Sequence, residues 1–245
     1  MPIPDLKGLR VLVTRPAGQE SGVMALVRQA GGKPIHFPVI EIVPLTAAPV
    51  SAPDLAIFVS ANAARYGLPL LRDTTATRFA AIGRATAQVL ADGGVEVSIT
   101  PPSPYNTETF LNEPALQQVD GLEIVIVRGQ GGRELLRREL EKRGANVRYL
   151  ECYRRVRPER DASSELVDNG LAAFDASLCT SVEGLLNLKR MFRPQHENLL
   201  LSLPVIVVSD RMRNEALKAG YKKVVRARNA SPEATVNALE GVLKA

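Results

Sequence analysis

The chain has 245 residues, of which 45% are hydrophobic and 23% charged, a composition typical of a folded globular protein rather than a disordered one. It has no run of eighteen apolar residues and no basic segment followed by an apolar one at its start, so we expect neither a membrane span nor a signal peptide and assign it to the cytoplasm. The 31 Lys and Arg against 26 Asp and Glu suit a small anionic partner but form no polybasic tract that would hold nucleic acid.

From residue 11 onward, apolar runs of four to six residues alternate with stretches of helical period. This alternation predicts βα units arranged around parallel sheets, because strands buried on both faces need helical crossovers. A further helix is expected from about Thr107, and the last helix from 230–233, where a serine precedes a proline. Glycines predicted to follow the ends of helices are Gly31, Gly93, Gly144 and Gly220.

The order of these elements is repeated once along the chain. Each copy has, in order, a predicted strand that ends in arginine, a helix, a glycine and a second strand, and two further strands follow. The matching segments are 11–15 with 124–128, 35–38 with 147–150, 55–63 with 176–184, and 79–86 with 205–212. This duplication predicts two similar lobes with a cleft between them.

Two stretches, 37–44 and 149–158, lie outside the βα rhythm and are extended in character. Each is closed by a proline and follows the first strand, helix and strand of its repeat, so both are candidates for linkers between the lobes. A cut near Asp120 would place the lobes end to end, whereas two linkers imply that the chain crosses between lobes twice. Periodicity leaves both divisions open.

Four junctions between a strand and a helix, at 60–63, 83–86, 129–133 and 180–183, offer free backbone N–H groups and the positive end of a helix dipole to an anion. The alternative is that Ser60, Thr86 and Ser181 only cap their helices. The stretch 128–133 is rich in glycine but lacks the lysine of a P-loop and the full spacing of a dinucleotide fingerprint, so it indicates nucleotide binding only weakly.

Arg15 and Arg128 end equivalent strands, and each could clamp a carboxylate or brace its own loop through a salt bridge. We favour the clamp. The arginines of the second linker could attract an anionic substrate, and a solvated basic linker explains them equally well; they are Arg154, Arg155, Arg157 and Arg160.

The cysteines and histidines give no indication of a metal site. Cys152 and Cys179 have no CxxC spacing and lie in separate strand-like segments, so we expect two buried thiols. His36 and His196 are isolated from each other and from other ligand residues, and we do not expect either to be catalytic.

Eight segments, in order, resemble the uroporphyrinogen-III synthase family across nearly the whole chain. They are VTRP (13–16), PVIEI (38–42), FVSANA (58–63), AIGRATA (81–87), RGQGGRELL (128–136), YRR (153–155), TS (180–181) and ASPE (230–233). The resemblance implies an α/β fold of two flavodoxin-like or Rossmann-like parallel-sheet lobes, interleaved and joined by a two-stranded linker, with a cleft between them. Lobe 1 would comprise 1–36 plus 161–245 and lobe 2 would comprise 37–160, with linker strands near 37–44 and 149–158.

The resemblance also implies a function. The family is a lyase of tetrapyrrole (haem, sirohaem) biosynthesis that needs no cofactor or metal. It cyclises hydroxymethylbilane to uroporphyrinogen III with loss of water, inverting the last pyrrole ring through a spiro intermediate. We accordingly expect a monomer that receives hydroxymethylbilane from hydroxymethylbilane synthase. Tyr153 matches the tyrosine most often proposed to assist departure of the substrate hydroxyl, and it could instead be a packing residue of a strand.

The junctions and the resemblance together define the candidate substrate-binding residues. They are Arg15, Ser60, Asn62, Gly83, Arg84, Thr86, Arg128, Gly129, Gly131, Arg133, Thr180, Ser181 and Ser209. Ser209 and Met212 depart from the glycine and threonine that the family usually has, so a close backbone approach and a hydroxyl contact are both in doubt there. Two other functions stay open: a two-lobed protein that binds a small anion without catalysis, and a nucleotide-using transferase built on 129–132.

Overall fold

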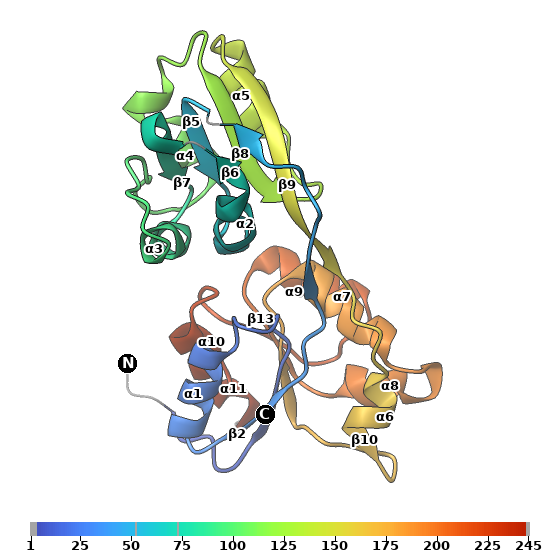
Figure 1. Cartoon of the computed structure of the whole chain (residues 1–245). Helices are drawn as coiled ribbons and strands as arrows, with labels where there is room; N and C mark the ends of the chain where they lie inside the picture. Colours follow the sequence, from blue (N-terminus) through green and yellow to red (C-terminus); the bar gives the residue numbers. More distant parts are fainter. Residues whose placement is uncertain (1–3, 52, 73, 244–245) are drawn as a thin grey trace. The chain divides into compact units, whose positions relative to one another are not determined.

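The computed structural model describes residues 4–51, 53–72 and 74–243 (Figure 1). The ends of the expected lobe 1, residues 1–3 and 244–245, lie outside these ranges. The chain separates into two compact units: unit 1 is Met1–Glu41 with Val156–Ala245, and unit 2 is Ile42–Arg155. The chain therefore crosses between units twice, at 41/42 and 155/156, where the sequence placed the crossings at 36/37 and 160/161.

Unit 1 is built on a five-stranded sheet in the order β14-β13-β12-β1-β2, with every neighbouring pair parallel. Its strands are β1 (Arg10–Val13), β2 (Lys33–His36), β12 (Ala176–Leu178), β13 (Val205–Val207) and β14 (Val224–Arg226), with a small antiparallel pair of β10 (Val167–Asp168) and β11 (Leu171–Ala172). Its helices are α1 (Ser21–Gln29), α6 (Ala162–Leu166), α7 (Val182–Met191), α8 (Pro194–Ser202), α9 (Asp210–Lys218), α10 (Pro232–Ala238) and α11 (Glu240–Leu243). Helices α1 and α10 lie side by side (Figure 1) and cover the core around Val11, Val13 and Ile206.

Unit 2 is built on a second five-stranded sheet, in the order β3-β9-β8-β5-β7. Its main strands are β3 (Glu41–Pro44), β5 (Leu55–Phe58), β7 (Arg78–Ala81), β8 (Glu123–Gly129) and β9 (Asn146–Val156), with a short parallel pair of β4 (Val50–Ser51) and β6 (Leu71–Arg72). Its helices are α2 (Ala61–Gly67), α3 (Arg84–Asp92), α4 (Thr107–Leu111) and α5 (Leu135–Lys142), and its 3₁₀ turns are η1 (Leu68–Leu70), η2 (Thr74–Ala76) and η3 (Pro114–Leu116).

The sheet of unit 2 buries both of its faces, as the uninterrupted apolar strands predicted. On β8, Ile124 and Ile126 pack into the cluster formed with α4 and α5. The alternate residues Val125 and Val127 pack into the cluster formed with α2 and α3. This alternation is the two-residue period of a strand, and it explains why helices are needed on both sides of the sheet (Figure 1).

The strand orders of the two units correspond. Unit 1 contains the order β2-β1-β12-β13 and unit 2 contains the order β9-β8-β5-β7, so the segments that match in sequence occupy matching positions. Each repeat therefore gives its first two strands to one unit and its next two to the other, and the expected interleaving of an α/β fold is confirmed. The two extended stretches supply β3 and most of β9, which are neighbours in one sheet. The predicted cleft stays a prediction.

The predicted helix ends are found at their glycines and caps. Gly144 follows α5 with φ +86°, a conformation that side chains rarely adopt, and a Cβ there would collide with the carboxylate of Asp120. Ser231 caps α10, accepting a hydrogen bond from the backbone N–H of Ala234 at 3.2 Å, and Asn106 caps α4. None of the described helices has the length and apolar character needed to cross a membrane.

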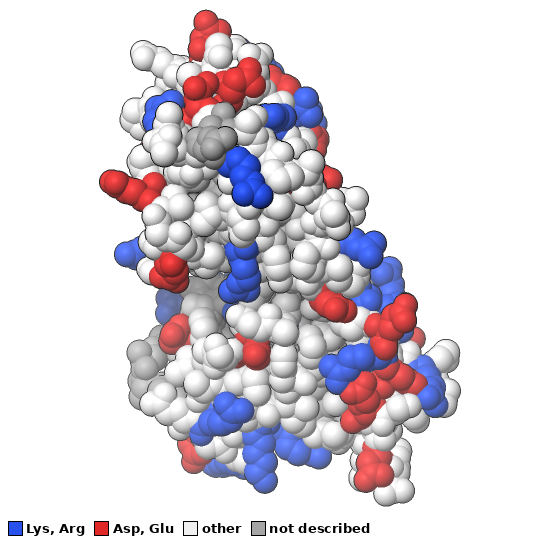
Figure 2. All heavy atoms as spheres, in the orientation of Figure 1, with Lys and Arg blue, Asp and Glu red and all other residues white. Residues whose placement is uncertain are grey.

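Basic and acidic side chains are interspersed on the face shown in Figure 2. Over α6 and α8 they form ion pairs, Arg160 with Glu165 and Arg193 with Asp161. Exposed pairs of this kind stabilise a protein by at most about 1 kcal/mol each, because water screens them. Much of the positive charge is therefore solvated surface.

Candidate functional site

Unit 2 brings Tyr153 and Ser60 together, although they are far apart in sequence. The phenol oxygen of Tyr153, which is 3% exposed, lies 3.1 Å from Oγ of Ser60. Ser60 caps α2, and its Oγ accepts the backbone N–H of Ala63 at 3.1 Å. The hydrogen bond from Ala63 uses only a lone pair of the Ser60 hydroxyl, so the O–H of Ser60 can donate to the phenol oxygen of Tyr153. The phenol proton is then free to be donated to another acceptor. Asn62, in the same turn of α2, is buried.

Gly129 accommodates the ring of Tyr153. A Cβ on Gly129 would lie 2.6 Å from Cζ, 2.7 Å from Cε2 and 3.0 Å from the phenol oxygen of Tyr153. The backbone N–H of Gln130 donates to the carbonyl of Tyr153 at 2.7 Å, which fixes the two strand ends to each other. The sequence placed Gly129 among the candidate substrate-binding residues, and the structure shows its close approach to Tyr153.

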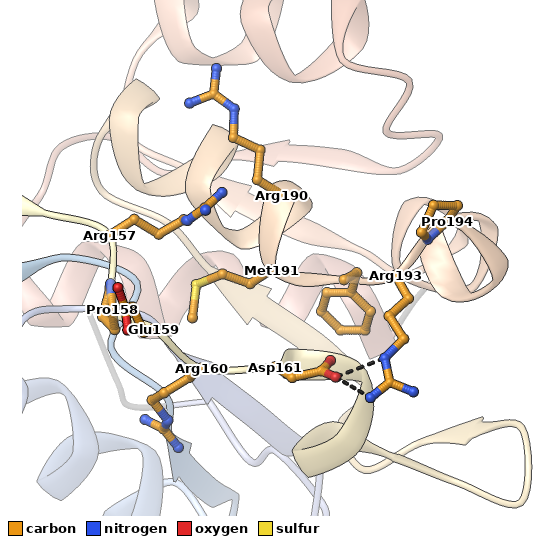
Figure 3. A pocket seen from close by; sticks show the side chains of 10 residues that line it. Arg157, Pro158, Glu159, Arg160, Asp161, Arg190, Met191, Arg193 and Pro194 are labelled. Carbon is orange, nitrogen blue, oxygen red and sulfur yellow. Dashed lines mark hydrogen bonds and ion pairs between the residues drawn. The ribbon is translucent and has the colours of Figure 1, made fainter.

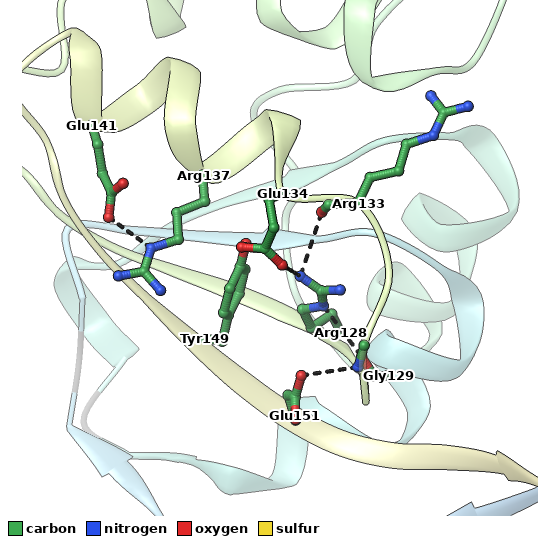
Figure 4. A network of polar contacts seen from close by, with 9 residues as sticks. Arg128, Gly129, Arg133, Glu134, Arg137, Glu141, Tyr149 and Glu151 are labelled. Atoms are coloured by element: carbon green, nitrogen blue, oxygen red, sulfur yellow. Dashed lines mark hydrogen bonds and ion pairs between the residues drawn. The ribbon is translucent and has the colours of Figure 1, made fainter.

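Arg128 is held by internal contacts (Figure 4). Its side chain is buried, and Nη1 donates to Oε1 of Glu134 at 3.2 Å while the guanidinium lies 4.4 Å from the ring centre of Tyr149. The hydroxyl of Tyr149 donates to the other oxygen of Glu134 at 2.7 Å. Burial, together with the neighbouring Glu134 carboxylate, raises the pKa of Tyr149 to about 12. Of the two roles left open for Arg128, the structure shows the brace, an ion pair with Glu134, and the clamp of a substrate carboxylate stays a prediction.

The glycine-rich stretch after Arg128 is a loop, because α5 begins only at Leu135. The expectation that 129–133 opens a helix is therefore wrong. The backbone N–H of Gly131 donates to Oε1 of Glu151 at 3.1 Å, so this N–H is already hydrogen-bonded to a carboxylate of the protein. Arg133 extends from the loop, with its side chain 72% exposed, and pairs with Glu108 at 3.2 Å.

The junction at the start of α3 differs from the one at α2. Gly83 occupies the cap position, and Arg84 begins the helix with an exposed side chain. Thr86 is buried within the first turn, and its backbone N–H donates to the carbonyl of Gly83 at 3.0 Å. The possibility that Thr86 caps a helix is therefore wrong, whereas Ser60 is a cap.

Unit 1 has two capped junctions of its own. Ser181, preceded by Thr180, caps α7 and accepts the backbone N–H of Gly184 at 3.0 Å. Ser209 caps α9 in the same way, accepting the backbone N–H of Met212 at 3.2 Å. The side chain of Met212 is buried, so the departure from a family threonine places a core residue there.

Arg15 follows β1 and is engaged differently from Arg128. Its Nη2 donates to the carbonyl of Ala230 at 2.7 Å, and burial lowers the pKa of its guanidinium. Within the described ranges it has no acidic partner, so its charge is not neutralised by the protein. Nε2 of His36 lies 2.9 Å from the carbonyl of Arg15, at the end of the neighbouring strand.

Sequence reasoning missed the contacts around Cys179. Thr14 is buried, and its Oγ1 donates to the carbonyl of Leu178 at 2.7 Å and lies 3.7 Å from Sγ of Cys179. Both cysteines are free and buried, which confirms the expectation of two buried thiols, and burial raises the pKa of Cys179 to about 12 and that of Cys152 to about 11. Thr14 precedes Arg15 directly, and its position at the end of an apolar strand is the signal that could have identified it.

Comparisons with known proteins agree on one family. A family model described as uroporphyrinogen-III synthase HemD matches residues 22–237. The uroporphyrinogen-III synthases of Salmonella typhimurium and Escherichia coli are 32% and 31% identical to the chain, with 95% of this chain and 100% of each relative covered.

Solved structures agree on the fold. A uroporphyrinogen-III synthetase from Helicobacter pylori superposes with a TM-score of 0.63 at 15% identity, covering 96% of this chain and 99% of the other. A mutant uroporphyrinogen III synthase from Thermus thermophilus superposes with a TM-score of 0.59 at 16% identity, covering 97% and 99%. At these identities the superpositions bear on the α/β fold alone.

Proposed function

Because the chain belongs to the uroporphyrinogen-III synthase family, we propose that it converts hydroxymethylbilane to uroporphyrinogen III with loss of water. It is a cyclising lyase of tetrapyrrole biosynthesis, and the last pyrrole ring is inverted through a spiro intermediate on the way to the product. The family match does not favour the two other functions, an anion-binding protein without catalysis and a nucleotide-using transferase.

The observation that carries the proposal for the chemistry is the contact between Tyr153 and Ser60. Departure of the terminal hydroxyl from hydroxymethylbilane gives an azafulvene, and that step needs modest help from an acid. In our proposal Ser60 donates to the phenol oxygen of Tyr153, and the phenol donates to the departing hydroxyl. The N–H of Ala63 holds Ser60 in the orientation that this requires.

The later steps need positioning more than acid–base chemistry. The azafulvene is attacked by the substituted carbon of the last pyrrole, the spiro intermediate fragments, and the ring closes with loss of a proton. Holding the ends of the flexible chain so that this path is faster than direct closure is an effect of orientation. We propose that Arg15, Arg84, Arg133 and the backbone N–H groups at the starts of α3, α7 and α9 bind the acetate and propionate groups of the substrate.

Three further properties belong to the same proposal. Hydroxymethylbilane closes unassisted to the type I isomer, so rapid hand-over from hydroxymethylbilane synthase would favour the correct product. We propose that the protein receives it in this way, as a monomer in the cytoplasm. Light scattering of the purified protein tests the monomer, and a dimer at micromolar concentration would contradict it.

A coupled assay with hydroxymethylbilane tests the function, followed by separation of the type I and type III isomers. We expect type III from the wild type, and type I alone would show that the proposed function is wrong. Tyr153→Phe is expected to slow turnover by about tenfold or more, since a positioned acid usually contributes about 100- to 10,000-fold. The control is Tyr221→Phe, which removes another buried hydroxyl that has no partner within the described ranges. Equal turnover rates for Tyr153→Phe and Tyr221→Phe would show that Tyr153 is a packing residue.

A further inference from the structure

A pocket of about 510 Å³ opens in unit 1, and its lining includes none of the residues to which the proposed function assigns a role (Figure 3). One side is formed by 157–161, just after the chain enters this unit, and the other by 190–194, where α7 gives way to α8. Four arginines and two acidic residues line it, and the rest of the lining is apolar.

Two of the four arginines are held by the protein. Arg193 pairs with Asp161, and Arg160 pairs with Glu165 while its guanidinium lies 4.2 Å from the ring centre of Phe37. These ion pairs hold the side chains of Arg160 and Arg193 and neutralise their two charges.

The other two arginines, Arg157 and Arg190, are exposed and have no acidic partner within the described ranges. They come from the two opposite sides of the lining; in Figure 3 the side chain of Arg157 extends toward Met191, and that of Arg190 extends away from it. Glu159 is the remaining acidic residue of the pocket and lies beside Pro158 (Figure 3). Two guanidinium groups without partners suit a ligand that carries two negative charges.

The surface next to these arginines is apolar. Met191 and Phe192 are each 5% exposed, and Pro158 is buried as well. The thioether of Met191 projects between Arg157 and Arg160 (Figure 3), where it can contact a flat ring. We propose that this pocket binds an organic dicarboxylate whose apolar body lies on Met191 and whose carboxylates pair with Arg157 and Arg190.

The pocket is separate from the capped junction at Ser181. Arg190 lies in the last turn of α7, whereas Ser181 caps its first turn. With a rise of about 1.5 Å per residue, the two positions are about 13 Å apart along the helix axis. Binding in the pocket can therefore be measured whether or not the proposed function is correct.

The four methionines of the chain provide a probe of this site, because Met191 is the one in the pocket. We would label the methionine methyl groups of the full chain with ¹³C and add benzene-1,3-dicarboxylate at low ionic strength, where ion pairing is least screened. Saturable movement of the Met191 resonance, with Met24 and Met212 unmoved, is the expected result. No movement of Met191 at millimolar ligand, or movement of Met212 alone, would overturn the assignment.

Variants and a second ligand test the role of the charges. The double variant Arg157→Gln/Arg190→Gln should bind the dicarboxylate about tenfold more weakly or worse, since two charge-assisted contacts are lost. The control is Arg138→Gln, an exposed arginine of α5 that should leave binding unchanged. Wild-type affinity in the double variant, or inorganic phosphate that binds as tightly as the dicarboxylate, would overturn the proposal.

Discussion

Replacing Gly129 by alanine tests the arrangement of the tyrosine directly. The added Cβ would lie 2.6 Å from Cζ of Tyr153, where carbon atoms in ordinary contact are about 3.5–4.0 Å apart. The ring must therefore withdraw by roughly 1 Å, and its backbone cannot follow freely because Gln130 donates to the Tyr153 carbonyl at 2.7 Å. The contact with Ser60, now 3.1 Å, would then be lost.

We expect two effects of Gly129→Ala. Overpacking of this kind lowers the free energy of unfolding by about 1–3 kcal/mol, which urea titration measures. Turnover of hydroxymethylbilane should fall to the level of Tyr153→Phe, because the phenol no longer faces the departing hydroxyl. Gly22→Ala is the matched control: its Cβ would lie 3.7 Å from Cγ of Pro232, and alanine should stabilise α1 by about 0.5–1 kcal/mol.

The double variant Gly129→Ala/Tyr153→Phe separates the local effect from a general loss of structure. If the glycine acts through the tyrosine, the second substitution should add little to the loss of kcat. The reasoning is refuted if Gly129→Ala turns over like the wild type, or if the losses of the two single variants multiply in the double variant.

Three other predictions concern stability. Met212→Thr should lower the free energy of unfolding by about 1–3 kcal/mol, because the side chain of Met212 is buried. The control is Leu217→Thr on the same helix, which should change it by less than about 0.5 kcal/mol because Leu217 is 46% exposed. Equal losses of stability in the two variants would contradict this prediction. Gly144→Ala should lower the free energy of unfolding by about 1–3 kcal/mol more than Gly121→Ala. Both glycines have a positive φ, but only a Cβ at Gly144 would meet a neighbouring carboxylate. Similar urea midpoints for the two variants would show that the structure relieves this collision. Burial raises the pKa of the Cys179 thiol from 9.0 to about 12, so the stabilising contribution of this thiol is complete below pH 9 and is lost as the pH rises toward 12. The free energy of unfolding should therefore fall over that pH range, and Cys179→Ala should make the fall less steep. An unchanged pH profile of stability in the variant would contradict the raised pKa of Cys179.

The sequence was sufficient for the fold because the signals involved are local or repeated. Buried strands read as apolar runs, and glycines such as Gly144 mark helix ends by their backbone conformation. The repeat then showed which strands correspond. Periodicity left the interleaved division and a cut near Asp120 open, and the family resemblance implied the interleaved division that the structure has.

The contacts within the candidate site could not be predicted in the same way. Tyr153, Ser60 and Gly129 come from β9, the start of α2 and the end of β8, so their meeting depends on register. The pairing of β8 with β9 shifts between Arg128 and Gly129, which places the glycine opposite Tyr153. Such an irregularity leaves no mark in the hydrophobic pattern.

Arg128 shows a second reason why the contacts within the candidate site could not be predicted from the sequence. A carboxylate from a ligand and the carboxylate of Glu134 are equivalent partners for a guanidinium, and only the path of the loop decides which is within reach. Tyr149 on β9 completes the contact from a distant part of the sequence. Residue type thus predicted the chemistry of Arg128 correctly but not its partner.

The interleaved topology also sets an order of events during synthesis of the chain. Strand β1 lies inside the sheet of unit 1, and Arg10 at its start bonds to Asp175, which is made 165 residues later. Unit 2 is one continuous segment, so it can fold on the ribosome while β1, α1 and β2 still lack the strands that cover them. A chain that stalls after residue 155 and before residue 176 would therefore carry one folded unit and one exposed apolar fragment. The segment of β1, α1 and β2 is then the part most in need of a chaperone.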